Sequence, residues 1–181
     1  MIRPVEERYR TVRDLFPELR IEMVGGRIVV NEPGTWQHNT IIAQVLFQLV
    51  PVVAERGWEI WPNISVFIGA EADRYVPDLT VVPQNPVMET DEAVHGRSTV
   101  LLVDVVAAGN AYDDHVVKPM SYAPAGVPLY LVIDPFQRMV KLHGGPEVSG
   151  YTQVTVEPVG VALHLPAPWD HTLDTGKLLD V

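Results

Sequence analysis

The chain has 181 residues, of which 47% are hydrophobic and 20% charged, and its formal net charge is −10. Its length suits one domain with a substantial core, no Ser/Gly-rich linker or internal repeat divides it, and no apolar run reaches the length of a membrane span. The lack of cysteine excludes disulfides and thiolate metal sites, and the first residues lack the apolar core of a secretory signal, so we expect a soluble, cytoplasmic protein. The negative charge argues against broad attraction to nucleic acid, although a local basic groove remains compatible with it.

The chain opens with a predicted short helix followed by a hairpin. Val5–Phe16 carries apolar residues at near-helical spacing, and we expect it to serve packing. Arg20–Val24 and Arg27–Asn31 are β-prone runs on either side of a Gly-Gly pair, which tolerates the positive φ angles of a two-residue turn. Glu22 lies between two apolar strand residues and points away from them, so it is either solvated or an inward-facing site carboxylate.

An amphipathic helix is predicted next. In Gln37–Arg56 the apolar residues recur with helical period, and Thr35 is placed to cap the start of the helix. Pro51 should kink or interrupt this helix. His38 falls in the first turn, where it is either a surface or cap residue or a functional group.

The following region contains a strand with an acidic residue at its head. Trp58–Ile68 alternates loosely between apolar and polar residues, and the polar stretch Gly69–Tyr75 predicts a turn. In Pro77–Val82 the proline fixes the backbone at the strand entry, and Asp78 follows it, either as a turn cap or as part of a site. Asn85–Arg97 shows no clear period and predicts a surface loop or short helix.

The segment Ser98–Pro135 has the form of a βαβ unit. Two apolar runs of strand length, Val100–Val106 and Leu129–Ile133, enclose a polar stretch long enough for one crossover helix. Parallel strands of this kind are buried on both faces, yet Asp104 interrupts the first run, where it needs hydrogen bonds, a cation or a metal ion. If the strand that begins at Asp78 pairs beside this one, the two carboxylates converge on a site that suits a hard cation such as Mg²⁺.

The crossover helix offers positive charge to such a site. Asp114, Lys118 and Tyr122 follow an i, i+4, i+8 spacing, which places them on one helical face. Lys118 is either a solvated helix residue or is aimed at the two carboxylates. Pro119 disfavours helical angles at Lys118, so a helix that begins near Lys118 is the alternative to a longer one.

The last part of the chain predicts antiparallel strands that extend the sheet. Strand-like pieces at Met139–His143, Tyr151–Val156 and Val161–Leu165 are separated by Gly and Pro turns, and Trp169–Leu179 should close the domain irregularly. We therefore predict one α/β domain over residues 1–181. It has a mixed β-sheet flanked by helices, an N-terminal hairpin and C-terminal antiparallel strands.

In this order and spacing the motifs resemble the Uma-type restriction endonuclease family, a bacterial branch of the PD-(D/E)XK nuclease superfamily. The resemblance covers most of the chain. It rests on IEMVGGRIVV at the hairpin, His38, VPDLTVV, LLVDVV, then Asn110 and Asp114 through Lys118 to Tyr122-Ala123 and AGVPLYLVIDP. The AGVP-Y-VIDP block and the strand that contains Pro77-Asp78 are its specific parts.

The resemblance implies a restriction-endonuclease-like core in which Asp78 and Asp104, together with the Val105 carbonyl, hold Mg²⁺, with Mn²⁺ as a substitute. The superfamily usually places a lysine two residues after the second acid, and members of this branch supply it from the helix, which corresponds to Lys118. Lys118 would orient or deprotonate the attacking water. Glu22 and His38 would hold an outer-sphere water and contact a phosphate. The implied substrate is DNA, and cutting both strands suits a homodimer.

Two departures from the family pattern bear on activity. The family usually has Glu where this chain has Asp104, and a Ser-Pro-Ser-like turn where it has Ala107-Ala108-Gly109. The shorter acid loosens the metal geometry, and the altered turn removes hydroxyls that support the site. Two hypotheses follow: a Mg²⁺-dependent DNA endonuclease, and a nuclease fold that no longer cuts and serves as a dimeric DNA- or protein-binding module.

Overall fold

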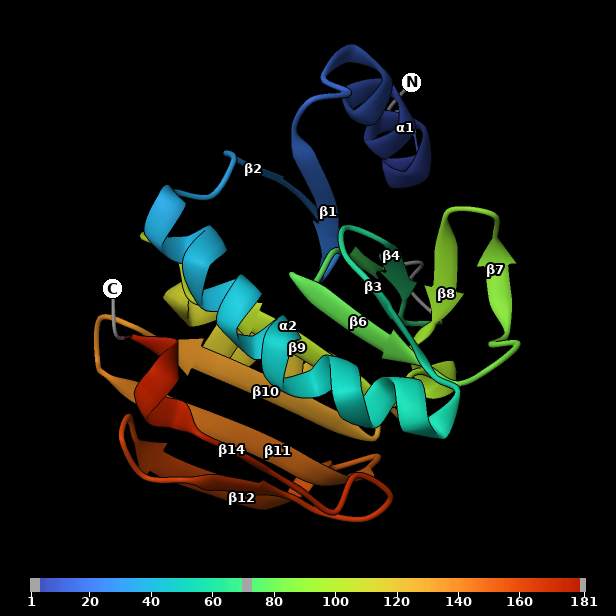
Figure 1. The fold of residues 1–181 in the computed structure, drawn as a ribbon. Coiled ribbons are helices and arrows are strands. Elements are labelled where there is room, and N and C mark those ends of the chain that lie inside the picture. The colour runs from blue at the N-terminus through green and yellow to red at the C-terminus, as the bar shows by residue number, and fades with distance from the viewer. Residues whose placement is uncertain (1–3, 70–72, 180–181) are drawn as a thin grey trace.

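The fold is taken from a computed structural model that describes residues 4–69 and 73–179. Within these residues the strands form two six-stranded sheets and one two-stranded sheet (Figure 1). The predicted Gly69–Tyr75 turn falls partly on residues 70–72, outside the described residues, and its end is a short strand, β5 (Arg74–Tyr75). The predicted mixed α/β class is confirmed.

The first sheet is built on the predicted hairpin. Helix α1 (Val5–Leu15) packs on β1 (Arg20–Val24), which pairs antiparallel with β2 (Arg27–Asn31). The strand order is β2-β1-β5-β4-β8-β7. The remaining strands are β4 (Ser65–Phe67), β7 (Met88–Thr90) and β8 (Ala93–His95).

The prediction of a loop or short helix over Asn85–Arg97 was wrong, because β7, β8 and the 3-10 turn Gly96–Ser98 lie here. β8 pairs in parallel with β4, and this partner lies far away in the sequence. The local hydrophobic pattern of residues 85–97 therefore gives no signal for this pairing.

The second sheet contains the predicted βαβ unit. Its order is β12-β11-β10-β9-β6-β3. As predicted, the two apolar runs pair in parallel, with Leu102 opposite Tyr130, and the strand after Asp78 lies beside the first of them, with Leu79 opposite Val103. The strands are β3 (Glu59–Trp61), β6 (Leu79–Val82), β9 (Leu101–Val105), β10 (Leu129–Asp134), β11 (Met139–Glu147) and β12 (Gly150–Pro158).

The crossover between β9 and β10 is a π-helical turn followed by a short α-helix. The π turn covers Asp113–Val117, and the Lys118 N–H donates to the Asp113 carbonyl, five residues back. Helix α3 (Lys118–Tyr122) then begins at Lys118, which agrees with the shorter of the two predicted helices. Lys118 is helical, with φ −61° and ψ −48°, although the following Pro119 disfavours these angles.

Helices cover both faces of the second sheet (Figure 1). α2 (Trp36–Arg56) packs on one face against alternate residues of β9 and β10, and α3 packs on the other. Of the predicted kink or interruption at Pro51, the interruption is wrong, because α2 is continuous through this residue. Pro51 lies on the exposed side of the helix, where water can satisfy the carbonyl that loses its donor.

The C-terminal part only partly extends the sheet. β11 and β12 add to it as predicted, whereas β13 (Leu163–Leu165) pairs with β14 (His171–Leu173) as a separate two-stranded unit. This unit and the 3-10 turn Thr175–Leu178 pack on α2, and their leucines complete its apolar core. In the part of the chain that the structure covers, no helix is both long enough and apolar enough to cross a membrane.

Candidate active site

Five charged side chains are buried together where β6 and β9 lie side by side. They are no more than 5% exposed, and they are Glu22, Asp78, Asp104, Asp114 and Lys118. Glu22 comes from β1, Asp78 immediately precedes β6, and Asp104 lies on β9. Because Leu79 pairs with Val103, the antiparallel register brings Asp78 opposite Asp104 at the next step. We call these five residues the buried charged cluster.

Asp78 is held as a carboxylate. Its Oδ1 lies 2.8 Å from the Arg20 guanidinium, and its Oδ2 accepts a hydrogen bond of 2.8 Å from the Val105 N–H. Burial alone would push the pKa of Asp78 up, but the hydrogen bond from His38 and the charge of Arg20 hold that pKa below its usual value. Asp78 therefore presents a negative charge at the head of β6.

Lys118 lies at the centre of the cluster. Its Nζ is 2.9 Å from Asp104 Oδ2, 2.7 Å from Asp114 Oδ1 and 4.0 Å from Glu22 Oε1. The contact with Asp114 is the i, i+4 pair of the crossover. Burial disfavours the charged amine, yet the surrounding carboxylates outweigh this and raise the pKa of Lys118 well above its usual value. Lys118 is thus an ammonium ion.

Asp104 and Asp114 resist ionisation. Burial raises the pKa of both, and that of Asp114 reaches about 7, despite the opposing charge of Lys118. The Tyr130 hydroxyl lies 3.0 Å from Asp104 Oδ2 and 3.2 Å from the Asp114 carbonyl, so one proton serves two acceptors. The neighbouring carboxylates also raise both pKa values, because like charges are gathered here.

Glu22 takes the inward-facing position of its two alternatives. Its Oε1 accepts from the Val76 N–H at 2.7 Å, and its Oε2 accepts from the Asn31 amide at 2.7 Å. The side-chain oxygen of Asn31, Oδ1, in turn accepts a hydrogen bond of 2.9 Å from the side-chain Nδ2 of Asn110. This chain of hydrogen bonds connects the hairpin with the Ala107-Ala108-Gly109 turn and fixes the Glu22 carboxylate.

His38 lies at the entrance of α2 and beside Asp78. Thr35 caps the helix by accepting from the His38 N–H at 3.3 Å, as predicted. His38 Nε2 lies 3.0 Å from the Val105 carbonyl and 3.2 Å from Asp78 Oδ2, both acceptors, so Nε2 carries the proton. The hydrogen bond to Asp78 raises the pKa of His38. The Val105 carbonyl, which was predicted to bind the metal ion, therefore contacts the His38 imidazole.

The donor atoms suit a divalent cation. Among the described residues, no three His, Cys, Asp or Glu side chains form a group that could hold a metal ion. The predicted set instead joins the carboxylates of Asp78 and Asp104 to the Val105 carbonyl, and all three are the oxygen donors that Mg²⁺ takes. Within residues 4–69 and 73–179, Arg20 and Lys118 are the permanent cations in contact with these carboxyl groups, and a divalent ion would favour the ionised forms of Asp104 and Asp114.

Sequence reasoning missed Arg20, Asn31 and Tyr130. Arg20 lies two residues before Glu22 on β1 and shares its face, so strand alternation offered a signal for it. Tyr130 shares a sheet face with Asp104 through the β9–β10 register, and Asn31 does so with Glu22 through the hairpin register. The two-residue turn sets the hairpin register, so it offered a signal for Asn31, whereas the β9–β10 register is not set by local spacing.

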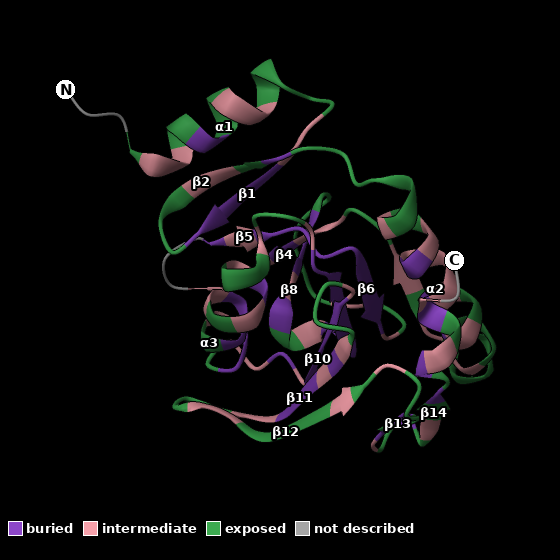
Figure 2. Cartoon of the chain, turned by 90° about the vertical axis from the view of Figure 1, so that its left-hand side faces the viewer, coloured by how far each residue is buried: buried purple, intermediate pink, exposed green. Residues whose placement is uncertain are grey.

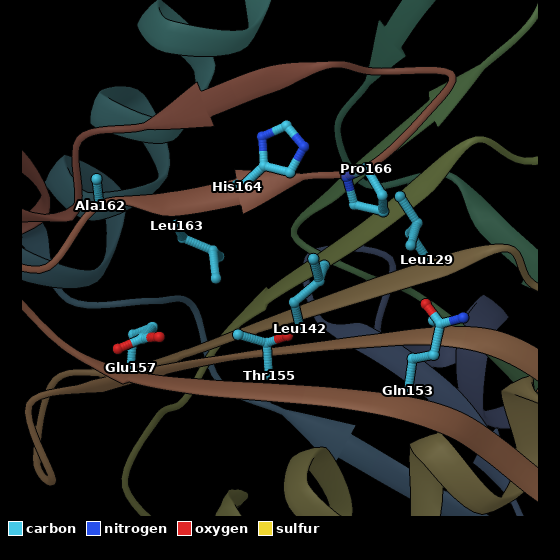
Figure 3. Close-up of a pocket in the computed structure, with 10 residues that line it drawn as sticks. Leu129, Leu142, Gln153, Thr155, Glu157, Ala162, Leu163, His164 and Pro166 are labelled. Carbon is cyan, nitrogen blue, oxygen red and sulfur yellow. The ribbon is translucent and has the colours of Figure 1, made fainter.

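A separate hollow of about 310 Å³ lies between β12 and β13 (Figure 3). The side chains of Gln153, Thr155 and Glu157 line it from β12, and the Leu163 side chain faces them from β13. None of its lining residues belongs to the buried charged cluster. The hollow is therefore not part of the candidate active site.

The sheet arrangement and the buried charged cluster define a nuclease fold of the restriction-endonuclease-like kind. Over residues 6–175 the chain matches the Uma2 family, described as "Putative restriction endonuclease", and it belongs to that family. A crystal structure from Anabaena variabilis, described as "a putative nuclease belonging to DUF820", has a TM-score of 0.69 and 15% identity. The match covers 88% of this chain and 89% of that one. At this identity the likeness shows the fold alone. No curated protein gives a significant match.

Proposed function

We propose that the protein is a Mg²⁺-dependent DNA endonuclease that hydrolyses phosphodiester bonds, with Mn²⁺ as a substitute. The observation that supports it most is the buried charged cluster, in which four carboxyl groups surround Lys118 and Arg20 within a nuclease fold. A purely structural ion pair would need one carboxylate for each cation. The excess of carboxyl groups favours a site for a positive ligand.

Asp78, Asp104 and the Val105 carbonyl would hold the ion. When bound, Mg²⁺ supplies Lewis acidity to the phosphate and lowers the pKa of a water. His38 carries its proton on Nε2, beside Asp78 and the Val105 carbonyl, and would donate it to a phosphate oxygen. Arg20 neutralises Asp78 from the side of β1 and keeps it deprotonated.

Lys118 would act through its charge. The carboxylates around it keep it an ammonium ion, which suits orienting a water and offsetting charge on the phosphoryl oxygens rather than taking a proton. Glu22, fixed by Asn31 and Val76, holds the third carboxylate near Lys118 and would anchor an outer-sphere water. DNA is the proposed partner, in a homodimer whose two sites cut the two strands.

A second function rests on one specific observation. Asp104 is already bound by Lys118 and Tyr130, and it is shorter than the glutamate usual in the family. A site closed in this way would leave a dimeric DNA- or protein-binding module with a nuclease fold and no cleavage.

A cleavage assay on supercoiled plasmid DNA distinguishes the two functions. With Mg²⁺ or Mn²⁺ the protein should nick or linearise the plasmid, and a chelator should stop the reaction. Retained binding with no nicking under either metal would contradict the nuclease and favour the module.

Calorimetry with Mg²⁺ tests the ligands directly. Asp78→Asn and Asp104→Asn should each abolish binding while the protein stays folded, whereas Asp91→Asn, at an exposed turn, should leave the affinity unchanged. Unchanged affinity in both cluster variants would rule out this assignment of the metal ligands.

A further inference from the structure

The outer edge of β12 is long, and most of it is exposed. β12 pairs only with β11 among the described strands, and Val154 and Val156 on it are 51% and 49% exposed. Figure 2 shows most of the strand exposed at the rim of the molecule. Residues 151–156, YTQVTV, contain no charge and no proline. Proteins usually protect edge strands with charges, proline or short length. The opposite edge, β3, has such protection, with three residues that begin at Glu59.

The direction of the backbone groups on β12 follows from its ladder. The Val159 N–H donates to the Arg138 carbonyl at 2.9 Å, just beyond the ends of the two strands. Opposite pairs in an antiparallel ladder alternate between hydrogen-bonded and non-hydrogen-bonded. The register Leu142–Thr155 is in phase with that bond, so residues 153, 155 and 157 direct their N–H and C=O groups toward β11.

The intervening residues direct their backbone groups outward. Thr152, Val154 and Val156 turn their N–H and C=O groups away from β11, toward the free edge. Pro158 is next in this series, and it lacks an N–H at a position where β11 requires none. The β12 edge therefore offers three consecutive sets of donors and acceptors.

We propose that this edge pairs antiparallel with β12 of a second copy of the chain across a twofold axis, so that two six-stranded sheets become one. In the register with Val154 opposite Val154, Thr152 faces Val156 from either side. Every outward N–H and C=O group of these residues then has a partner. The exposed valines of the two copies lie next to each other and lose contact with water.

The strand suits a copy of itself better than an unrelated strand. The same register sets Glu157 opposite Tyr151, so no like charges oppose each other although the whole chain carries a net charge of −10. It also sets Pro158 opposite Gly150, at the ends of the ladder. Such self-complementarity is the requirement of an isologous interface. The proposal concerns assembly, and its tests do not depend on the proposed cleavage.

Sedimentation velocity on the full chain tests the interface. The wild-type protein should be dimeric, and Val154→Lys should raise the dimer dissociation constant at least about 100-fold, because two ammonium groups would face each other across the axis. Val154→Thr keeps the shape and adds no charge, so it should remain dimeric. A circular dichroism melt should show that all three proteins fold alike, since Val154 is half exposed. A monomeric wild-type protein at about 100 µM, or a Val154→Lys dimer as tight as wild type, would overturn the proposal.

A cross-link tests the register. The chain has no cysteine, so Val154→Cys introduces a single thiol. Hydrogen-bonded antiparallel pairs have Cα atoms about 5.5 Å apart, within the range that a disulfide spans. With copper–phenanthroline as the oxidant, Val154→Cys should form a covalent dimer nearly completely. Val161→Cys, 44% exposed and outside β12, should not. Equal cross-linking of the two variants would mean random collision and contradict the proposed register.

Discussion

The two faces of β9 and β10 differ in what they bury. On the α2 face, alternate residues of both strands join an apolar core that includes Leu101, Val103 and Leu131. On the α3 face, the residues between them include Asp104 and Tyr130, which belong to or contact the buried charged cluster. Because side chains alternate along a strand, the same two strands stabilise the fold on one face and carry the candidate chemistry on the other.

The α3 face also carries a series of aromatic rings beside the charges. Tyr75 and Tyr122 have ring centres 5.1 Å apart, Tyr122 and Tyr130 4.9 Å, and Tyr130 and His143 5.8 Å. Tyr151 continues the series 5.4 Å from His143. These rings exclude water from one side of the cluster, and a low local dielectric strengthens the interactions within it. The comparison teaches that the α3 face uses aromatic packing to enclose charge, whereas the core on the α2 face is mainly aliphatic and includes Trp169.

The largest expected effect is a loss in the free energy of unfolding, which should be greater for a substitution on the α2 face than for one on the α3 face. Leu131→Ala on the α2 face should lower the free energy of unfolding by about 2–5 kcal/mol, because it leaves a cavity at a position that is 0% exposed. Its Mg²⁺ affinity and its activity per folded molecule should not change. Tyr130→Phe, one residue earlier on the other face, loses one hydroxyl and should cost only about 1–2 kcal/mol. Urea unfolding measures both, and equal losses would break the division between the faces.

The second effect concerns the aromatic series. Burial, with the charges of Lys141 and His115 adding to it, lowers the pKa of His143 to about 4, from the usual 6.5. The unfolded chain therefore binds a proton more readily. The contribution of His143 to the free energy of unfolding is therefore fully present above pH 6.5. As pH falls toward 4, the free energy of unfolding decreases by about 3 kcal/mol.

His143→Phe keeps a ring in the stack and removes this titration. Urea unfolding at pH 7 and pH 4 should show a stability loss smaller by about 3 kcal/mol in the variant than in wild type. If both proteins lose the same stability, His143 does not couple the aromatic series to pH.

The third effect tests the charges of the α3 face. Lys118→Ala should leave Mg²⁺ binding nearly intact, because Lys118 is not a proposed ligand, and should lower the cleavage rate about 100-fold. Lys118→Arg should not restore it, because a planar guanidinium does not replace a compact ammonium between Asp104 and Asp114. Plasmid cleavage at the wild-type rate by the alanine variant would remove Lys118 from the mechanism.

The smallest effect is expected from Asp104→Glu. The family resemblance favours the longer acid, so this variant should fold and should cleave at the wild-type rate or somewhat faster. A sharp loss of activity would show that Lys118 and Tyr130, at 2.9 and 3.0 Å from Asp104, have fixed the site around the shorter side chain. Asp104 would then be an adaptation rather than a departure that weakens the site.

Local patterns predicted the parts of the fold that depend on nearby residues. Alternation placed Asp104 on the face of Leu102 and Val106, and the βαβ form gave the parallel pairing of β9 and β10. The i, i+4 spacing matched the Asp114–Lys118 contact. Contacts between distant segments were not predictable in this way. Arg20 meets Asp78 from 58 residues away. The parallel pairing of β8 with β4 likewise has no local period.

The π-helical turn before α3 has a consequence for chain length. Each residue of an α-helix rotates the following side chain by about 100° around the helix axis. Because the Lys118 N–H bonds to the Asp113 carbonyl five residues back, a chain with the exposed Val116 deleted would make the same bond four residues back, as in an α-helix. The π turn therefore accommodates one residue more than an α-helical turn while Lys118 keeps its place beside Asp104.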